Sequence, residues 1–213
     1  MPKYDLLIFD FDGTLVDTAP DIAFHANVVL ERLSFQRRSL EQVKKAIGRG
    51  VHDLMMTLAP PLAKDSVLLE QAVKMFKEKY IHQPVIETVL YPGVRDMVEG
   101  PLKDYKKAIV TNKPHELTLQ ILRLLDLESI FEVVIGMGIE YPPKPNPQSV
   151  ISVMEQLKSP PSKTILVGDS RIDWQTATNA GISFLRMTYG YDDEPIPGSP
   201  ASGSAYDWKS HLI

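Results

Sequence analysis

The sequence predicts an α/β fold, a doubly wound parallel sheet that is interrupted once by a helical insertion. Three observations lead to this prediction. Short apolar runs that end in polar turns alternate with longer stretches of helical periodicity, as in parallel βαβ units. A long helical region without strand-like patterning separates the first apolar run from the second. The 213 residues are enough for one core domain and a small insertion.

Five apolar runs predict the strands of the sheet. The first covers residues 4–9, and the sequence Asp-Phe-Asp-Gly that follows it predicts a sharp turn. The other runs cover residues 107–110, 133–135, 164–167 and 183–186. A helical stretch follows each of the first four runs, so we expect right-handed crossovers and a Rossmann-like core.

The insertion is expected to form a helical cap domain. Its helices are predicted at residues 17–33, 40–47, 51–58 and 64–82. In the last of these, one apolar stripe at helical spacing is formed by Leu68, Ala72, Met75 and Phe76. We expect no strand in this region, and the core resumes with a helix at residues 94–102. The expected division is a core domain of residues 1–16 and 85–213 and a cap domain of residues 17–84.

The last part of the sequence, from residue 192 on, predicts a loop and a short helix. Residues 192–204 are rich in Pro, Gly and Ser, and this composition predicts a flexible loop. Residues 206–212 are expected to form a short terminal helix. The sequence assigns a function to neither segment.

Composition excludes several classes of partner. The chain has 27 acidic and 23 basic residues and a formal charge of -4, which offers no electrostatic footprint for nucleic acid or an anionic membrane. It has no cysteine, which excludes disulfides and thiolate chemistry. No apolar run is long enough to span a membrane. We therefore expect a cytoplasmic protein, a monomer or homodimer, whose partner is a small molecule.

Polar side chains follow the predicted strands, where ligands bind in a doubly wound sheet. They are Asp10, Asp12, Thr111, Asn112, Lys144, Asp169 and Asp173. Clustered carboxylates repel one another unless a hard cation lies among them, and oxygen ligands of this kind favour Mg²⁺. The hydroxyl, amide and ammonium groups of the others are donors suited to a tetrahedral anion. A metal, an anion and a carboxylate nucleophile together suggest phosphoryl transfer.

In order and spacing, these motifs resemble those of the haloacid dehalogenase-like phosphohydrolases. The motifs are DFDGTLVD at residues 10–17, TN at 111–112, KP at 144–145 and GDSRID at 168–173. Within that superfamily, further segments are similar to the phosphoglycolate phosphatase group: DTAPDI at 17–22, IGRG at 47–50, TNKP at 111–114 and TYGY at 188–191. The sequence departs from the group at residues 136–140, GMGIE, where acidic residues usually follow the glycine.

The resemblance implies roles for three carboxylates. Asp10 would attack phosphorus and form an aspartyl phosphate, while Asp12 would act as general acid and then as general base. Asp10, the backbone carbonyl of Asp12 and the side chain of Asp169 would hold Mg²⁺. A lone Asp-x-Asp-Gly is more often only a turn, so this interpretation depends on the companion motifs.

The remaining motif residues would serve the phosphoryl group. Lys144, Thr111 and Asn112 would bind its oxygens and neutralise their charge. Asp173 would orient Lys144 or a water molecule on the metal. Each residue also has an ordinary interpretation. Thr111 and Asn112 fit a helix N-cap, Lys144 a solvated loop lysine, and Asp173 an acid in the first turn of a helix.

Arg49 lies between two glycines in the insertion, and two interpretations stay open. The segment Gly48-Arg49-Gly50 is either a plain turn between helices or a loop that places Arg49 over the core site. In the second case the guanidinium would bind a second anionic group of the substrate. A turn requires glycine but does not require arginine.

The leading hypothesis is therefore a Mg²⁺-dependent phosphatase of a small phosphomonoester, with 2-phosphoglycolate as the expected substrate. The alternatives are a sugar phosphomutase similar to β-phosphoglucomutase, or a pyrophosphatase. Sugar phosphomutases of this fold tend to read Asp-Thr-Ala-x-x-His after the catalytic turn, whereas here Ile22 stands at the place of the histidine. A dehalogenase is disfavoured because its leaving group needs no acid such as Asp12.

Overall fold

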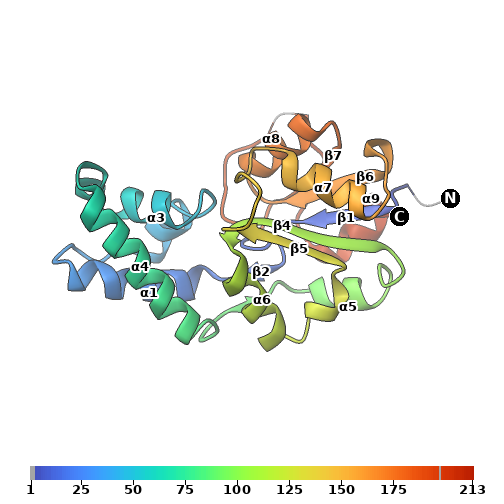
Figure 1. Ribbon diagram of the computed structural model, residues 1–213. Coiled ribbons are helices and arrows are strands. Elements are labelled where there is room, and N and C mark those ends of the chain that lie inside the picture. The colour runs from blue at the N-terminus through green and yellow to red at the C-terminus, as the bar shows by residue number, and fades with distance from the viewer. Residues whose placement is uncertain (1–2, 197) are drawn as a thin grey trace.

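A computed structural model describes residues 3–196 and 198–213 and contains a six-stranded parallel sheet in the order β5-β4-β1-β6-β7-β8. The strands are β1 Leu6–Phe9, β4 Lys106–Pro114, β5 Val133–Met137, β6 Thr164–Gly168, β7 Ser183–Met187 and β8 Ala201–Ser202. Helices cover both faces of the sheet, with α5 and α6 on one side and α7 and α8 on the other (Figure 1). The predicted doubly wound α/β core is confirmed.

Strand β1 is continuously apolar because both of its faces are buried. Leu7 and Phe9 belong to the hydrophobic core beneath α5, α6 and α9, and Leu6 and Ile8 to the core beneath α7 and α8. The covering helices are α5 Val94–Glu99, α6 His115–Leu124, α7 Gln148–Gln156, α8 Arg171–Ala180 and α9 Trp208–Leu212. The predicted helix at 94–102 thus ends earlier, at Glu99.

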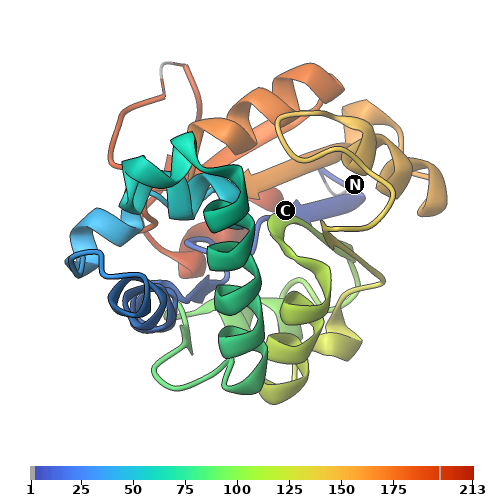
Figure 2. The same cartoon turned by 60° about the vertical axis from the view of Figure 1, so that its left-hand side comes forward.

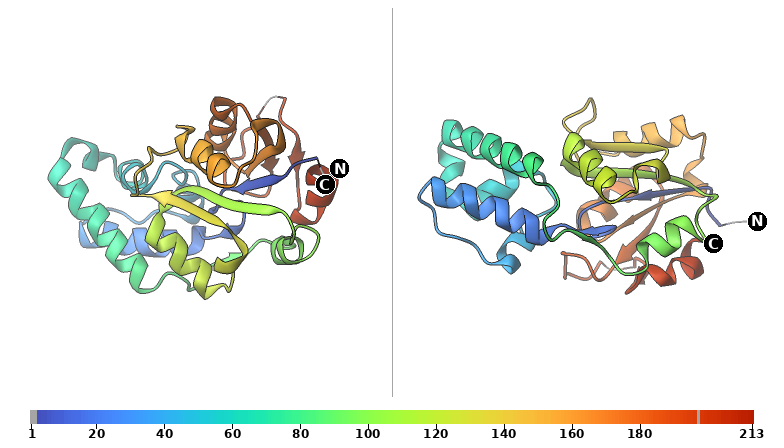
Figure 3. Two further views of the ribbon diagram at one scale, coloured as in Figure 1. Left: turned by 45° about the vertical axis from the view of Figure 1, so that its right-hand side comes forward. Right: turned by 90° about the horizontal axis from the view of Figure 1, so that it is seen from below.

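The helices of the insertion lie beyond one end of the sheet, which the views from the front and from below both show (Figures 1 and 3). They are α1 Ala19–Arg32, α2 Leu40–Lys44, α3 Val51–Leu58 and α4 Ser66–His82, with a 3₁₀ turn at Pro60–Lys64. In the expected stripe of α4, Ala72 and Phe76 are buried, and Leu68 and Met75 pack partly buried against the core cluster. No helix in the described residues is long and apolar enough to cross a bilayer.

Our prediction that no strand lies between β1 and β4 is wrong. β2 Val16–Asp17 and β3 Val89–Leu90 form an antiparallel pair where the chain enters and leaves the helical insertion. Strands of two residues are too short to show alternation, so the sequence gives no signal for them.

Asp21 of α1 also joins the segment that enters the insertion to the segment that leaves it, and its carboxylate is buried. It accepts hydrogen bonds from the backbone N–H groups of Ile86, Glu87 and Thr88, at 2.9 to 3.0 Å, and from the Thr88 hydroxyl at 2.6 Å. The connection between the insertion and the sheet is therefore a double linker held by hydrogen bonds.

The expectation of a loop at residues 192–204 is wrong at one point. Ala201 and Ser202 form β8, which pairs in parallel with Arg186 and Met187 of β7. Residue 197 lies outside the described residues. The terminal helix is α9, preceded by a 3₁₀ turn at Ala205–Asp207. The sequence did not predict β8, because the Pro-, Gly- and Ser-rich composition around it is typical of a turn.

Candidate active site

The turn after β1 places Asp10 at the carboxyl end of the central strand. The backbone N–H of Phe11 donates to Asp10 Oδ1 at 2.7 Å, and Gly13 N–H donates to the carbonyl of Val16 at 3.0 Å. Gly13 has φ +82°, and a Cβ at this residue would lie 2.4 Å from Asp169 Oδ2. Only glycine allows the turn to approach the carboxylate at the end of β6 so closely.

Two further carboxylates follow β6. Asp169 accepts from the Thr14 hydroxyl at 3.2 Å and from the Tyr191 backbone N–H at 2.7 Å. Asp173, in the first turn of α8, accepts through Oδ2 from the backbone N–H and the hydroxyl of Ser170, at 3.1 and 2.6 Å. This reciprocal arrangement is a capping box, so the ordinary interpretation of Asp173 as a first-turn acid holds for one of its oxygens.

Lys144 joins these groups from the loop between β5 and α7. Its ammonium lies 2.9 Å from Asp10 Oδ1 and 2.6 Å from Asp173 Oδ1, and the side chain is 2% exposed. Burial lowers the pKa of Lys144, but the carboxylates of Asp10 and Asp173 outweigh it and raise the pKa above the ordinary value. Lys144 is therefore not a solvated loop lysine.

Asp10, Asp169 and Asp173 offer oxygen atoms that all lie within 4.8 Å of one another. Burial raises the pKa of Asp10 to about 7, with the charge of Asp173 adding to the shift and Lys144 opposing it. Burial, together with the charges of Asp173 and Asp10, also raises the pKa of Asp169. If all three carboxylates are ionised, the one ammonium leaves two negative charges in a buried place. A divalent cation would neutralise them, and an all-oxygen donor set fits a hard one.

Thr111 and Asn112 do not cap a helix, because β4 continues through both of them. Thr111 lines the pocket described below. The amide nitrogen of Asn112 donates to the carbonyls of Gly48 and Lys144 at 2.9 and 3.0 Å, and its oxygen accepts from the Lys144 backbone N–H at 2.8 Å. Both amide hydrogens of Asn112 are in use, so its side chain fixes the Lys144 loop and the turn at Gly48.

The side chain of Asp12 is not part of the group formed by Asp10, Asp169 and Asp173. Its Oδ1 accepts from the Thr18 hydroxyl at 2.5 Å and from the ammonium of Lys113 at 2.9 Å. Lys113 also donates to the Tyr80 hydroxyl of α4 at 3.2 Å. Our sequence reasoning missed Lys113 as a site residue, although it is part of the motif at residues 111–114.

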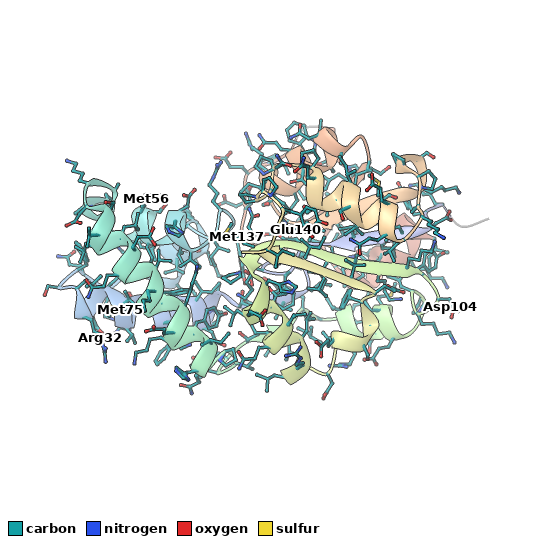
Figure 4. All side chains as sticks on the ribbon, in the orientation of Figure 1. Arg32, Met56, Met75, Asp104, Met137 and Glu140 are labelled. Atoms are coloured by element: carbon teal, nitrogen blue, oxygen red, sulfur yellow. The ribbon has the colours of Figure 1, made fainter. Side chains whose placement is uncertain are left out.

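The turn that carries Arg49 rests against the sheet. Gly50 has φ +90°, and a Cβ there would lie 2.6 Å from Met137 Cε. Figure 4 shows Met137 at the end of β5 nearest to the helical insertion. The exposed side chain of Arg49 has no hydrogen bond or ion pair with the rest of the described chain. Close packing against Met137 therefore explains why residue 50 is a glycine. No contact within the described chain explains why residue 49 is an arginine.

A pocket of about 550 Å³ lies between the helical insertion and the carboxyl ends of the strands. Figure 2, turned toward the insertion, shows α4 passing in front of this end of the sheet. The pocket is lined by Asp10, Asp12, Thr111, Asn112, Lys113 and Asp169 of the core and by Arg49, Ile22, Phe76 and Tyr80 of the insertion, among others. Lys144 and Asp173 do not line the pocket. Lys144 contacts Asp10, which does line it, and Asp173 contacts Lys144.

Comparison with known proteins gives consistent matches. Residues 7–187 match the family model of the haloacid dehalogenase-like hydrolases. The chain is 34% identical over 197 residues to a phosphoglycolate phosphatase of Pseudomonas syringae pv. syringae, covering 90% of this chain and 71% of the relative. It is 33% identical to one from Aquifex aeolicus, with 87% and 85% covered. A crystal structure described as a predicted phosphoglycolate phosphatase from Haemophilus somnus superposes with a TM-score of 0.91 at 26% identity, covering 99% of each chain.

Proposed function

The chain belongs to the haloacid dehalogenase-like hydrolase family and is a phosphatase of that family, and we propose that it hydrolyses 2-phosphoglycolate with Mg²⁺ as cofactor. The resemblance that the sequence motifs indicated is thereby confirmed. The observation that carries the proposal is the buried group of three carboxylates and one ammonium, of which Asp10 and Asp169 line the pocket. The names of the relatives support the choice of substrate.

In the proposed reaction, a carboxylate oxygen of Asp10 attacks phosphorus while the bond from phosphorus to the leaving oxygen breaks. Asp12 gives that oxygen a proton, and the products are glycolate and an aspartyl phosphate on Asp10. Asp12 then takes a proton from water as the water attacks phosphorus, the bond from Asp10 to phosphorus breaks, and phosphate leaves with the Asp10 carboxylate restored. Both side chains line the same pocket, as this sequence of steps requires.

Asp10, Asp169 and the backbone carbonyl of Asp12 are proposed to hold Mg²⁺, which would withdraw charge from the phosphoryl oxygens when bound. Lys144 and the Thr111 hydroxyl would bind the same oxygens. Asp173 would keep Lys144 in place, since its Oδ1 is 2.6 Å from the ammonium. Contact between Asn112 and the phosphoryl group stays a prediction. In this structure the amide nitrogen of Asn112 donates to the carbonyls of Gly48 and Lys144 instead.

We further propose that residues 17–84 act as a cap domain on a core of residues 1–16 and 85–213. The pocket has walls from both parts, so closure of the insertion would exclude bulk water from the reacting groups. The remote wall would then select substrates by size and by charge. Arg49, Lys45 and Asp53 are charged side chains on that wall without a side-chain partner in the described chain, and we propose that Arg49 is the one that binds an anionic group of the substrate.

A phosphatase is favoured over a sugar phosphomutase because no imidazole lines the pocket next to Asp12 in the described chain. Ile22 lines it instead, and an aliphatic side chain carries no proton. His25, one helical turn further along α1, is 2% exposed, and its Nε2 lies 2.9 Å from the carbonyl of Gln83. It therefore does not replace the missing histidine.

Incubation with Mg²⁺ in ¹⁸O-labelled water is the test of this proposal. We expect 2-phosphoglycolate to release inorganic phosphate that carries the label, because water attacks phosphorus of the aspartyl phosphate. We expect sugar phosphates to give no isomer and pyrophosphate to be a poor substrate. Mass spectrometry of the phosphate measures the label. Isomerised sugar phosphate with little free phosphate would favour the mutase, and preferred hydrolysis of pyrophosphate would favour the pyrophosphatase.

Replacing Arg49 by Ala is expected to lower kcat/KM for 2-phosphoglycolate by roughly ten- to a hundredfold. A hydrogen bond to a charged group contributes about 1.5–3 kcal/mol, and the substrate carboxylate would lose one. The loss for phenyl phosphate, which has no carboxylate, should be at most a few fold. Arg37→Ala is the matched control, since Arg37 is an exposed arginine of the insertion that pairs with Glu31. Equal losses on both substrates would assign Arg49 to the structure of the turn.

A further inference from the structure

Lys113 is a buried lysine whose ammonium lies between the sheet and the helical insertion. Its side chain is 2% exposed and ends 2.9 Å from Asp12 Oδ1. On the other side, the ammonium is 3.2 Å from the Tyr80 hydroxyl and 4.7 Å from the centre of the Tyr80 ring. A lysine that is buried and held by three contacts has lost the side-chain freedom that surface lysines keep.

The two oxygens of Asp12 have unequal surroundings. Oδ1 accepts from both the Thr18 hydroxyl and the Lys113 ammonium. Oδ2 has no hydrogen-bond donor among the described residues, and Asp12 lines the pocket. When Asp12 is protonated, the proton therefore belongs on Oδ2, because Oδ1 already faces two donors. The contacts to Oδ1 fix which oxygen is available to a bound ester.

We propose that Lys113 is a positioning residue for Asp12, holding Oδ1 so that Oδ2 faces the leaving oxygen of the substrate, and that Tyr80 holds Lys113. The proposal rests on the proposed function, in which Asp12 is the general acid. Lys113 acts on the reaction through Asp12 and does not itself transfer the proton.

Tyr80 brings the helical insertion into this arrangement. Its ring is 1% exposed and packs against His25 of α1, with ring centres 4.9 Å apart, and against Phe76 of α4 at 5.5 Å. The position of the Tyr80 hydroxyl is thus set by α1 and α4 packed together. Lys113 belongs to β4, so the contact between the two exists only while the insertion lies against the sheet. Asp12 is then fully positioned only when the pocket is closed.

The alternative is that Lys113 binds an anionic group of the substrate directly. Two aryl phosphates separate the two roles, because both carry the same phosphate and no second anionic group and differ only in the leaving group. 4-Nitrophenolate leaves without a proton, whereas the more basic phenolate depends on the acid. The ratio of kcat/KM for 4-nitrophenyl phosphate to that for phenyl phosphate therefore reports how well Asp12 is positioned. This ratio concerns the transfer to Asp10 and excludes the later hydrolysis.

The experiment measures this ratio in the 213-residue chain with Mg²⁺. Lys113→Met is expected to raise it about tenfold, in the direction of Asp12→Asn, because general acid catalysis contributes about 10² or more. Tyr80→Phe, which keeps the ring and loses the hydroxyl, should raise it by a few fold. Lys107→Met is the matched control. Lys107 is a buried lysine of the same strand whose ammonium bonds only to backbone carbonyls of residues that do not line the pocket, and its loss should leave the ratio unchanged.

Equal losses on the two aryl esters in Lys113→Met and Tyr80→Phe would overturn the proposal, as would a loss confined to 2-phosphoglycolate. If Lys113→Met does not fold, Tyr80→Phe alone decides, with an unchanged ratio against the proposal. An unchanged ratio in Asp12→Asn would instead overturn the role of Asp12 as general acid, so the two failures are distinguishable.

Discussion

Replacing Asp10 by Asn is expected to lower kcat for 2-phosphoglycolate by roughly four orders of magnitude or more, while the protein stays folded. The amide has nearly the size of the carboxylate, and its oxygen can still accept from the Phe11 N–H and from Lys144. It carries no charge and cannot form the acyl phosphate, so the chemical step is lost. Loss of nucleophile charge, and not loss of packing, is the cause.

Steady-state turnover and the circular dichroism spectrum together check this expectation. Asp104→Asn is a matched control, because Asp104 is exposed and lies at the end of the sheet opposite to the insertion (Figure 4). That variant should keep wild-type turnover. A folded Asp10→Asn protein with near-normal activity would remove Asp10 from the role of nucleophile.

The clustering of Asp10 with Asp169 was predictable from the sequence because parallel strands end at one edge of a sheet. Their motifs follow β1 and β6, which are neighbours in the sheet with Phe9 opposite Val167. Apolar runs buried on both faces also made the central strands predictable. The strands β2, β3 and β8 were not predictable, since two residues carry no period and their hydrogen bonds depend on partners distant in the chain.

The hydrogen bonds of the site residues could not be predicted either. Asn112 fits a phosphate contact by residue type, yet its amide bonds to Gly48 in the insertion, 64 residues away in the sequence. Lys113 gave no signal of its own, because nothing in its sequence neighbourhood indicates Tyr80 or Asp12 as partners. Such contacts follow from how the insertion packs on the sheet, which motif spacing does not specify.

Removal of divalent metal is expected to abolish turnover, and Mg²⁺ should restore it. Without the cation, ionised carboxylates of this group outnumber the single ammonium of Lys144, and the excess negative charge repels the phosphate of the substrate. Asp169→Ala should lose activity at any practical Mg²⁺ concentration, since the variant lacks one of the carboxylates that are proposed to hold the cation. The measurement is turnover after exhaustive chelation and after titration with Mg²⁺. Full activity in the chelated protein would contradict the metal site.

Thermal unfolding gives a second readout that does not depend on activity. A cation bound at a hundredfold excess over its Kd stabilises the folded state by about 2.7 kcal/mol, or roughly 5–10 °C in Tm for a chain of this size. We expect Mg²⁺ to raise Tm by about this amount in the wild type at pH 8 and by much less in Asp169→Ala.

The shift in Tm should also depend on pH. Burial raises the pKa of Asp10 from an ordinary 3.8 to about 7, so the folded chain keeps a proton that the unfolded chain has already released. The stability that this group contributes is present at low pH and is lost as the pH rises through about 7. Mg²⁺ competes with that proton, so it should raise Tm more at pH 8 than at pH 5. A larger shift at pH 5 would mean that the cation binds elsewhere than at Asp10.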